Sequence, residues 1–175
     1  MPIRCLCLDV DGVLTSGRLW VDDAGRPLRA FHVQDGLAIR WFQRLGGECV
    51  IITGKESNGV AARARELDIR HVRQGVEDKR AVMDEVLESL KIPREQVAAI
   101  GDDLPDLPML RNCGFPIAVA NASAPVRAAA RYVTRKRGGG GAVREAIELL
   151  LSREGRWNEV IAHYERQAGS GGMGE

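Results

Sequence analysis

Three features are missing from this chain of 175 residues, and each absence argues against a class of protein. The formal net charge is only +1, so the chain lacks the strongly basic surface that binds nucleic acid or an acidic membrane, and we expect neither partner. No apolar run is long enough to span a bilayer, and no charged start leads into an apolar stretch with a cleavage site. The sequence therefore predicts a soluble, cytoplasmic protein.

Metal-ligand spacing is missing as well, because Cys5, Cys7, Cys49 and Cys113 are scattered along the chain. Cys5 and Cys7 would share one face of a strand, where free cysteines behave as small apolar residues. The chain is long enough for one domain with a core, and we assign residues 1–168 to it. The glycine-rich end, residues 169–175, is predicted to be a flexible tail.

Apolar runs alternate with amphipathic stretches along the chain. The runs predicted as strands are residues 3–10, 48–53, 69–72, 97–101, 116–120 and 131–134. The stretches predicted as helices are residues 35–45, 58–67, 79–90, 106–112, 124–130, 143–151 and 157–166. This alternation predicts an α/β fold, a three-layer Rossmann-like parallel sheet with helices on both faces. Active sites of such sheets lie beyond the carboxyl ends of the strands.

One interval, residues 17–33, breaks the alternation. Asp22-Asp23-Ala24-Gly25 stands between two arms of alternating apolar residues, which is typical of a β-hairpin. The hairpin would begin beside the end of the first strand, so we interpret it as a flap over that edge of the sheet. The chain has no other room for a separate cap domain.

Asp9 and Asp11 stand at the end of the first predicted strand. Two carboxylates in that position are costly unless another charge compensates them. A divalent cation is the usual compensation, and a carboxylate beside it can attack phosphorus. Gly12 permits the tight turn that would bring Asp11 round to the same side. Taken alone, these residues are equally typical of an ordinary turn.

Two further segments offer groups that could bind a phosphoryl group. Thr53 and Gly54 follow the strand at 48–53, and a Thr hydroxyl and an exposed backbone N–H can each donate to a phosphate oxygen. Lys79 opens a helix, where its ammonium could lie among carboxylates and phosphoryl oxygens. Each segment has an ordinary alternative, because Thr-Gly is common in turns and single lysines are mostly solvated.

Asp102, Asp103 and Asp106 gather directly after the strand at 97–101. Together with Asp9 and Asp11, they concentrate negative charge at one edge of the sheet. Oxygen ligands with open coordination positions suit Mg²⁺, which keeps waters and bridges to phosphate. Helix capping would account for one of these residues but not for three.

In this order, the segments resemble the four motifs of the haloacid dehalogenase superfamily. The resemblance covers most of the chain and is closest to the capless 3-deoxy-D-manno-octulosonate 8-phosphate phosphatases. The closer likeness is carried by residues 9–20, 31–39, 74–75 before Lys79, 101–106 and 141–145. Members of that family are magnesium-dependent homotetramers of lipopolysaccharide synthesis. The resemblance therefore implies Mg²⁺, a sugar-acid phosphate as substrate and a homo-oligomer, most simply a tetramer.

The resemblance also implies roles for the site residues. Asp9 would be the nucleophile that forms an aspartyl-phosphate, and Asp11 would be the general acid and then the base. Asp9, Asp102 and the backbone carbonyl of Asp11 would bind Mg²⁺, with support from Asp103 and Asp106. The residues implied for phosphate binding are Thr53, Gly54 and Lys79.

The length of the substrate stays open at this point. After Thr53-Gly54 this chain continues with Lys55-Glu56-Ser57, where many octulosonate phosphatases have Arg first. Close relatives that hydrolyse a nine-carbon sugar-acid 9-phosphate carry an acidic residue nearby, so Glu56 allows either substrate. Arg135 and Arg137 are candidates to meet the substrate carboxylate.

A receiver domain of phospho-signalling is the alternative from another functional class. It also uses Asp, Thr, Lys and Mg²⁺, but its acidic pair follows the first strand and its phosphoacceptor follows a later one. Here Thr53 follows the second strand, and Asp11 offers an acid two residues beyond the candidate nucleophile. A stable aspartyl-phosphate without turnover would favour the receiver domain.

Overall fold

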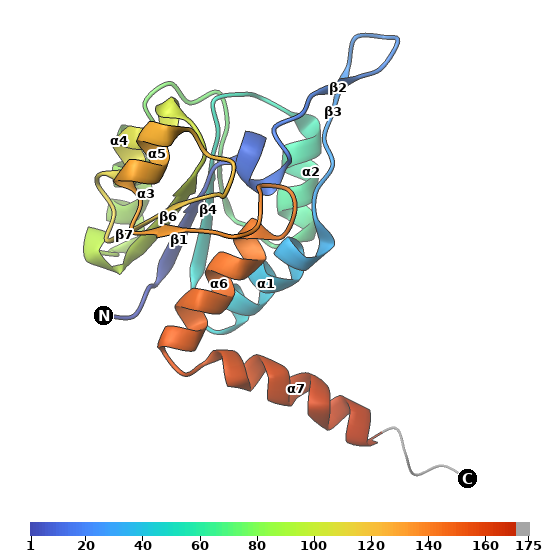
Figure 1. Ribbon diagram of the computed structural model, residues 1–175, viewed down its shortest axis with the longest axis vertical. Coiled ribbons are helices and arrows are strands. Elements are labelled where there is room, and N and C mark those ends of the chain that lie inside the picture. Colours follow the sequence, from blue (N-terminus) through green and yellow to red (C-terminus); the bar gives the residue numbers. More distant parts are fainter. Residues whose placement is uncertain (171–175) are drawn as a thin grey trace.

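The computed structural model describes residues 1–170, with side chains up to residue 167. Its main sheet has six parallel strands in the order β5-β4-β1-β6-β7-β8 (Figure 1). The strands are Cys5–Leu8 (β1), Glu48–Ile52 (β4), His71–Arg73 (β5), Val97–Gly101 (β6), Phe115–Ala118 (β7) and Tyr132–Val133 (β8). Each overlaps a strand predicted from the sequence, which confirms the α/β fold.

Helices cover both faces of this sheet. They are Val33–Arg44 (α1), Asn58–Glu66 (α2), Lys79–Leu90 (α3), Leu107–Leu110 (α4), Ala124–Ala129 (α5), Ala142–Arg153 (α6) and Trp157–Ser170 (α7). On one face α1 packs against α6, and α2 lies beside α1, where Gln43 donates to the carbonyl of Leu67 (2.8 Å). On the other face α3, α4 and α5 lie together (Figure 1). The result is the predicted three-layer arrangement.

The central strands form the core because helices exclude water from both of their faces. Leu6, Leu8 and Ile100 are fully buried in β1 and β6, and Ile52 is fully buried in β4. The sulfurs of Cys5 and Cys7 lie 4.0 Å apart, as expected for alternate residues on one face of a strand.

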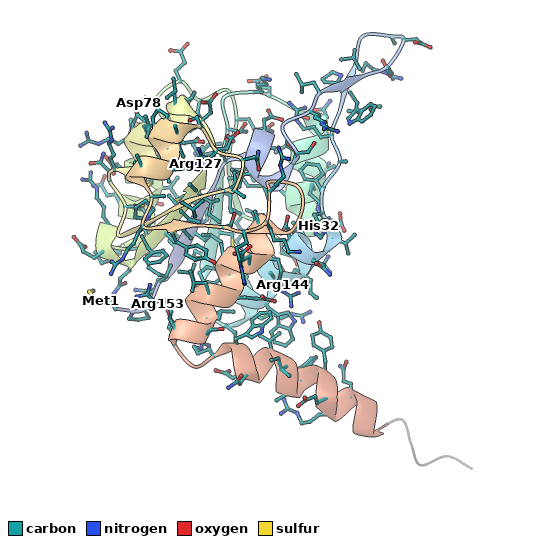
Figure 2. The ribbon with its side chains drawn as sticks, viewed as in Figure 1. Met1, His32, Asp78, Arg127, Arg144 and Arg153 are labelled. Carbon is teal, nitrogen blue, oxygen red and sulfur yellow. The ribbon has the colours of Figure 1, made fainter. Side chains whose placement is uncertain are left out.

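The strand order reverses between β1 and β6. From β1 the chain moves to β4 and β5, whereas from β6 it moves the other way to β7 and β8. Ligands of open α/β sheets bind at such a switch point, beyond the carboxyl ends of the strands. We call this side of the molecule the carboxyl edge. In Figure 2, Asp78 at the start of α3 lies at this end, and Met1 and Arg153 lie at the opposite end.

The segment between β1 and α1 is a hairpin, as predicted. Its strands β2 (Trp20–Val21) and β3 (Pro27–Leu28) are antiparallel, with Trp20 opposite Leu28. The hairpin extends away from the domain at the carboxyl edge (Figure 1). Phe31 differs from the rest of the predicted flap, because it packs against the core under the guanidinium of Arg63.

The last helix, α7, extends from the opposite end of the molecule (Figure 1). Its Tyr164 hydroxyl accepts a hydrogen bond from Trp41 Nε1 of α1 (3.0 Å), and the two rings meet edge to face. α7 continues to Ser170, two residues into the predicted tail, and residues 171–175 lie outside the described residues. Within residues 1–170, the helices are too short or too polar to cross a membrane.

Candidate active site

The turn after β1 lies against Asp102, which follows β6 at the carboxyl edge. Residues 10–14 form a wide turn that closes where Thr15 N donates to the carbonyl of Val10 (3.0 Å). Gly12 has φ +105°, and a Cβ on it would stand 2.0 Å from Asp102 Oδ2. Glycine is therefore required here both by the backbone conformation and by the approach of Asp102.

A buried lysine joins two carboxylates at the centre of the site. Lys79 Nζ lies 2.6 Å from Asp9 Oδ1 and 2.6 Å from Asp106 Oδ1. All three side chains are buried. Asp78 caps the start of α3 by accepting from the backbone N–H groups of Arg80 and Ala81, which fixes the helix from which Lys79 projects. Lys79 is therefore an internal counter-ion and not a solvated surface lysine.

Three carboxylates form a candidate cation site. Oxygens of Asp9, Asp102 and Asp106 all lie within 4.8 Å of one another. Asp106 commits Oδ1 to Lys79 and Oδ2 to the backbone N–H groups of Asp102 (2.8 Å) and Asp103 (3.3 Å). Asp106 is thus engaged in holding the loop in place. The ligand atoms on offer are all hard carboxylate oxygens, which Mg²⁺ prefers and soft metal ions do not.

The three carboxylates carry more negative charge than Lys79 alone can compensate. Burial raises the pKa of Asp9 to about 6, with a further increase from Asp106 and an opposing decrease from Lys79. Burial, followed by repulsion from Asp9 and Asp106, raises the pKa of Asp102 to about 7. Burial alone would lower the pKa of Lys79, but the two carboxylates raise it overall. A divalent cation would allow all of these carboxylates to ionise.

The predicted phosphate-binding residues lie on the neighbouring loop. Thr53 is buried at the end of β4, and its backbone bonds both to Arg73 at the end of β5 and to Val76. Gly54 follows it and is exposed, with space for a Cβ only in ordinary contact with the Val76 carbonyl. The structure thus brings Thr53, Gly54 and Lys79 to the same edge as the carboxylates.

Asp11 has a partner that the sequence analysis did not identify. Arg29, just after β3, donates from Nε to Asp11 Oδ1 (2.8 Å) and from Nη2 to Asp11 Oδ2 (3.2 Å). Its Nη1 also donates to Ser57 Oγ (3.0 Å). The Asp11 carboxylate therefore faces the flap and is not a member of the carboxylate trio. A single Arg in a hairpin arm carries no pattern that would have predicted this contact.

The glycine run at 138–141 packs against the turn after β1. Gly139 N donates to the Val13 carbonyl (2.9 Å), and Gly138 N donates to Asn121 Oδ1 (2.8 Å). A Cβ on Gly138 would overlap the Gly12 carbonyl at 1.6 Å. The run is therefore a loop, and glycine at position 138 is needed for its close approach. Asn121 was not expected to support the site.

The remaining predicted residues lie at the periphery. Asp103 is exposed and begins the turn at Leu104–Asp106. Glu56 is exposed beside Gly75 on the next loop. Arg135 has a side chain 90% exposed, with Nε 3.6 Å from Glu145, and Arg137 is also exposed. Glu56, Arg135 and Arg137 occupy loops that follow strands of the sheet, where an incoming ligand could reach them.

Comparisons with known proteins identify the family of this chain. A family model of haloacid dehalogenase-like hydrolases matches residues 72–147. The 3-deoxy-D-manno-octulosonate 8-phosphate phosphatase KdsC of Escherichia coli (strain K12) is 43% identical over 158 residues, which is 90% of this chain and 84% of KdsC.

Solved structures show the same fold. A 3-deoxy-D-manno-octulosonate 8-phosphate phosphatase from Moraxella catarrhalis, in complex with magnesium, phosphate and KDO, matches with a TM-score of 0.90 and 41% identity over 93% of each chain. A cobalt-bound deoxy-D-mannose-octulosonate 8-phosphate phosphatase from Haemophilus influenzae matches with a TM-score of 0.85 and 35% identity, over 87% of this chain and 90% of the other. With this identity along most of both chains, the protein is a phosphomonoesterase that belongs to the haloacid dehalogenase-like hydrolases, in the branch of the KdsC phosphatases.

Proposed function

We propose that this protein hydrolyses 3-deoxy-D-manno-octulosonate 8-phosphate through an aspartyl-phosphate on Asp9. The observation that carries the proposal is the pairing of Asp9 with Lys79 at the switch point of the sheet, beside Asp102. The E. coli and M. catarrhalis relatives named for this substrate support its identity. On this proposal the enzyme serves lipopolysaccharide synthesis, as its resemblance implies.

The proposed reaction has two balanced steps. An Asp9 carboxylate oxygen attacks phosphorus, the bond from phosphorus to the sugar oxygen breaks, and that oxygen takes a proton from Asp11. Water then attacks the phosphorus of the aspartyl-phosphate and gives a proton to Asp11. This step releases inorganic phosphate and restores Asp9.

The chain's own residues supply most of the surroundings for these steps. Asp9, Asp102 and the backbone carbonyl of Asp11 would hold Mg²⁺, which would supply positive charge to the phosphoryl group. Thr53 and Gly54 would donate to phosphate oxygens, and Lys79 would keep the Asp9 carboxylate in place. Asp106 and Asp103 would hold the loop that carries Asp102.

We further propose a homo-oligomer, most simply a tetramer, in which neighbouring flaps cover the sites. Leu19, Trp20, Val21 and Leu28 are each more than half exposed on the hairpin, a concentration of apolar surface that is unusual for a free protein surface. Covering the open edge would exclude water and strengthen electrostatic stabilisation of the phosphoryl group. In that closed site Arg135 or Arg137 would meet the sugar carboxylate.

A phosphate-release assay in excess Mg²⁺ tests the substrate. We expect kcat/KM for the eight-carbon 8-phosphate to exceed that for a nine-carbon sugar-acid 9-phosphate by about tenfold or more, since a few well-placed contacts discriminate by about that factor. A preference for the nine-carbon substrate would replace the proposed substrate and point to Glu56. A stable phosphoprotein without phosphate release would instead favour a receiver domain.

A further inference from the structure

Arg29 reaches from the flap into the site. The hairpin around it is largely exposed, yet the Arg29 side chain is only 4% exposed. It uses three different nitrogens, two on the Asp11 carboxylate and one on Ser57 Oγ. These contacts join the turn after β1, the flap and the residue before α2.

The geometry of this contact restricts Asp11 more than a simple ion pair would. A guanidinium that bonds both oxygens of a carboxylate fixes the plane of the carboxylate as well as its distance. The bond to Ser57 in turn limits rotation of Arg29 itself. Burying the guanidinium has a desolvation cost, which this full set of partners offsets. Asp11 is therefore held by Arg29 of the flap, whereas Asp9 is held by Lys79 at the start of α3.

We infer that Arg29 is a positioning residue, which orients Asp11 for proton transfer to the leaving group and from the attacking water. The inference rests on the proposed function, in which Asp11 is the acid and then the base. When Asp11 carries the proton, its other oxygen can still accept from Arg29, so the contact is compatible with both halves of the reaction. Through Arg29, the position of the flap determines whether the acid is correctly placed.

The dependence of rate on the leaving group distinguishes this role from a merely structural one. Departure of a sugar alkoxide needs a proton from an acid, whereas p-nitrophenolate leaves readily without one. General acid catalysis contributes about 10²- to 10⁴-fold where it is needed. Because kcat/KM covers only the steps up to aspartyl-phosphate formation, it is unaffected by the later attack of water. A misplaced Asp11 should therefore lower kcat/KM selectively for the sugar phosphate.

The test compares 3-deoxy-D-manno-octulosonate 8-phosphate with p-nitrophenyl phosphate in excess Mg²⁺. For Arg29→Gln we expect kcat/KM to fall by about 100-fold on the sugar phosphate and by less than about tenfold on p-nitrophenyl phosphate. Arg29→Lys keeps the charge but loses the two-point contact, so it should recover only part of the loss. The matched control is Arg26→Gln, because Arg26 pairs with Asp22 within the hairpin and should leave both rates unchanged.

Equal losses of Arg29→Gln on the two substrates, or no loss, would overturn the inference. Arg29→Lys guards against a folding defect, because equal losses in that variant, when its unfolding curve matches that of the wild type, would overturn the inference as well. Asp11→Asn distinguishes an error in the role of Arg29 from an error in the proposed role of Asp11 as the acid. If Asp11→Asn shows the leaving-group dependence and Arg29→Gln does not, only the role of Arg29 is wrong. If Asp11→Asn lacks the dependence, the proposed acid is wrong and the inference falls with it.

Discussion

The carboxyl edge and the flap both depart from the usual distribution of side chains, in opposite directions. Asp9, Lys79 and Asp106 are charged and at most 5% exposed, whereas Trp20 and Val21 are apolar and more than 60% exposed. At the edge the chain compensates its own buried charge, because Lys79 lies between two carboxylates. On the flap the apolar surface stays open to solvent. One chain therefore assembles the reactive groups by itself, while its flap keeps apolar surface that another surface could cover.

The largest expected effect on activity comes from replacing Asp9, the proposed nucleophile at the carboxyl edge. Asp9→Asn should lower kcat by at least ~10³-fold, because an amide cannot attack phosphorus. Phosphate release in excess Mg²⁺ measures the loss. A thermal unfolding curve close to that of the wild type would show that the fold is intact, since Asn has the same size. Activity within tenfold of the wild type would remove Asp9 from the role of nucleophile.

Removing the Lys79 charge while keeping Asp9 should show how much the stability of the buried Asp9 and Asp106 carboxylates depends on Lys79. Lys79→Met leaves Asp9 and Asp106 without their cation and should lower the free energy of unfolding by about 3–5 kcal/mol. Urea unfolding at pH 8 measures this loss, which should shrink at pH 5 where the carboxylates can protonate. Lys55→Met is the matched control, because Lys55 is exposed and should cost less than about 0.5 kcal/mol. Equal stability of the two variants would contradict the picture of a buried counter-ion.

The stability of the metal-free protein should depend on pH through the buried carboxylates of the carboxyl edge. The pKa values of Asp9, about 6, and Asp102, about 7, lie above the ordinary value of about 4 in an unfolded chain. Between these values the folded protein binds more protons than the unfolded one, so stability should fall as the pH rises from about 4 to about 7. Calorimetry of the metal-free protein should therefore give a lower Tm at pH 7.5 than at pH 5.

Added Mg²⁺ should reverse this fall, because it binds the ionised carboxylates of the folded state. At a concentration of 100 times its Kd, the gain would be about 2.7 kcal/mol at pH 7.5. A flap variant such as Trp20→Asp should show the same pH and Mg²⁺ response as the wild type, since the flap holds none of these carboxylates. A metal-free protein that is as stable at pH 7.5 as at pH 5 would contradict the assignment.

The parts of this structure that the sequence predicted are those determined by local pattern. Strand and helix periodicity located the sheet, and the carboxyl ends of parallel strands necessarily meet at one edge. That is why Asp9, Thr53 and Asp102, each at a strand end, could be placed together before the structure was known. Lys79 followed from its position at the start of a helix on the same edge.

The parts that the sequence did not predict depend on how loops meet. Arg29 reaches Asp11 only because the second arm of the hairpin returns beside the turn after β1, and no residue spacing encodes that contact. The contact of Gly138 with Gly12 joins loops that are far apart in the chain, so no local pattern in the sequence could predict it. Phe31 lies in the predicted flap but packs on the core. The sequence could not predict this, because apolar patterning alone does not specify which surface a side chain will cover.

The smallest expected effect on chemistry comes from the other side of the comparison, the flap. Trp20→Asp replaces an exposed apolar ring of the flap with a charged side chain. This change should weaken association of the flaps and shift the mass measured by light scattering from a tetramer towards a monomer. Activity should fall several-fold on the sugar-acid phosphate and less on p-nitrophenyl phosphate, which needs fewer contacts with a closed site. Ile161→Asp is the matched control, because Ile161 is exposed on α7 at the opposite end of the molecule and should leave assembly and activity unchanged. A wild-type protein that is a fully active monomer at the assay concentration would show that the flap needs no partner, and the exposed apolar surface would then require another explanation.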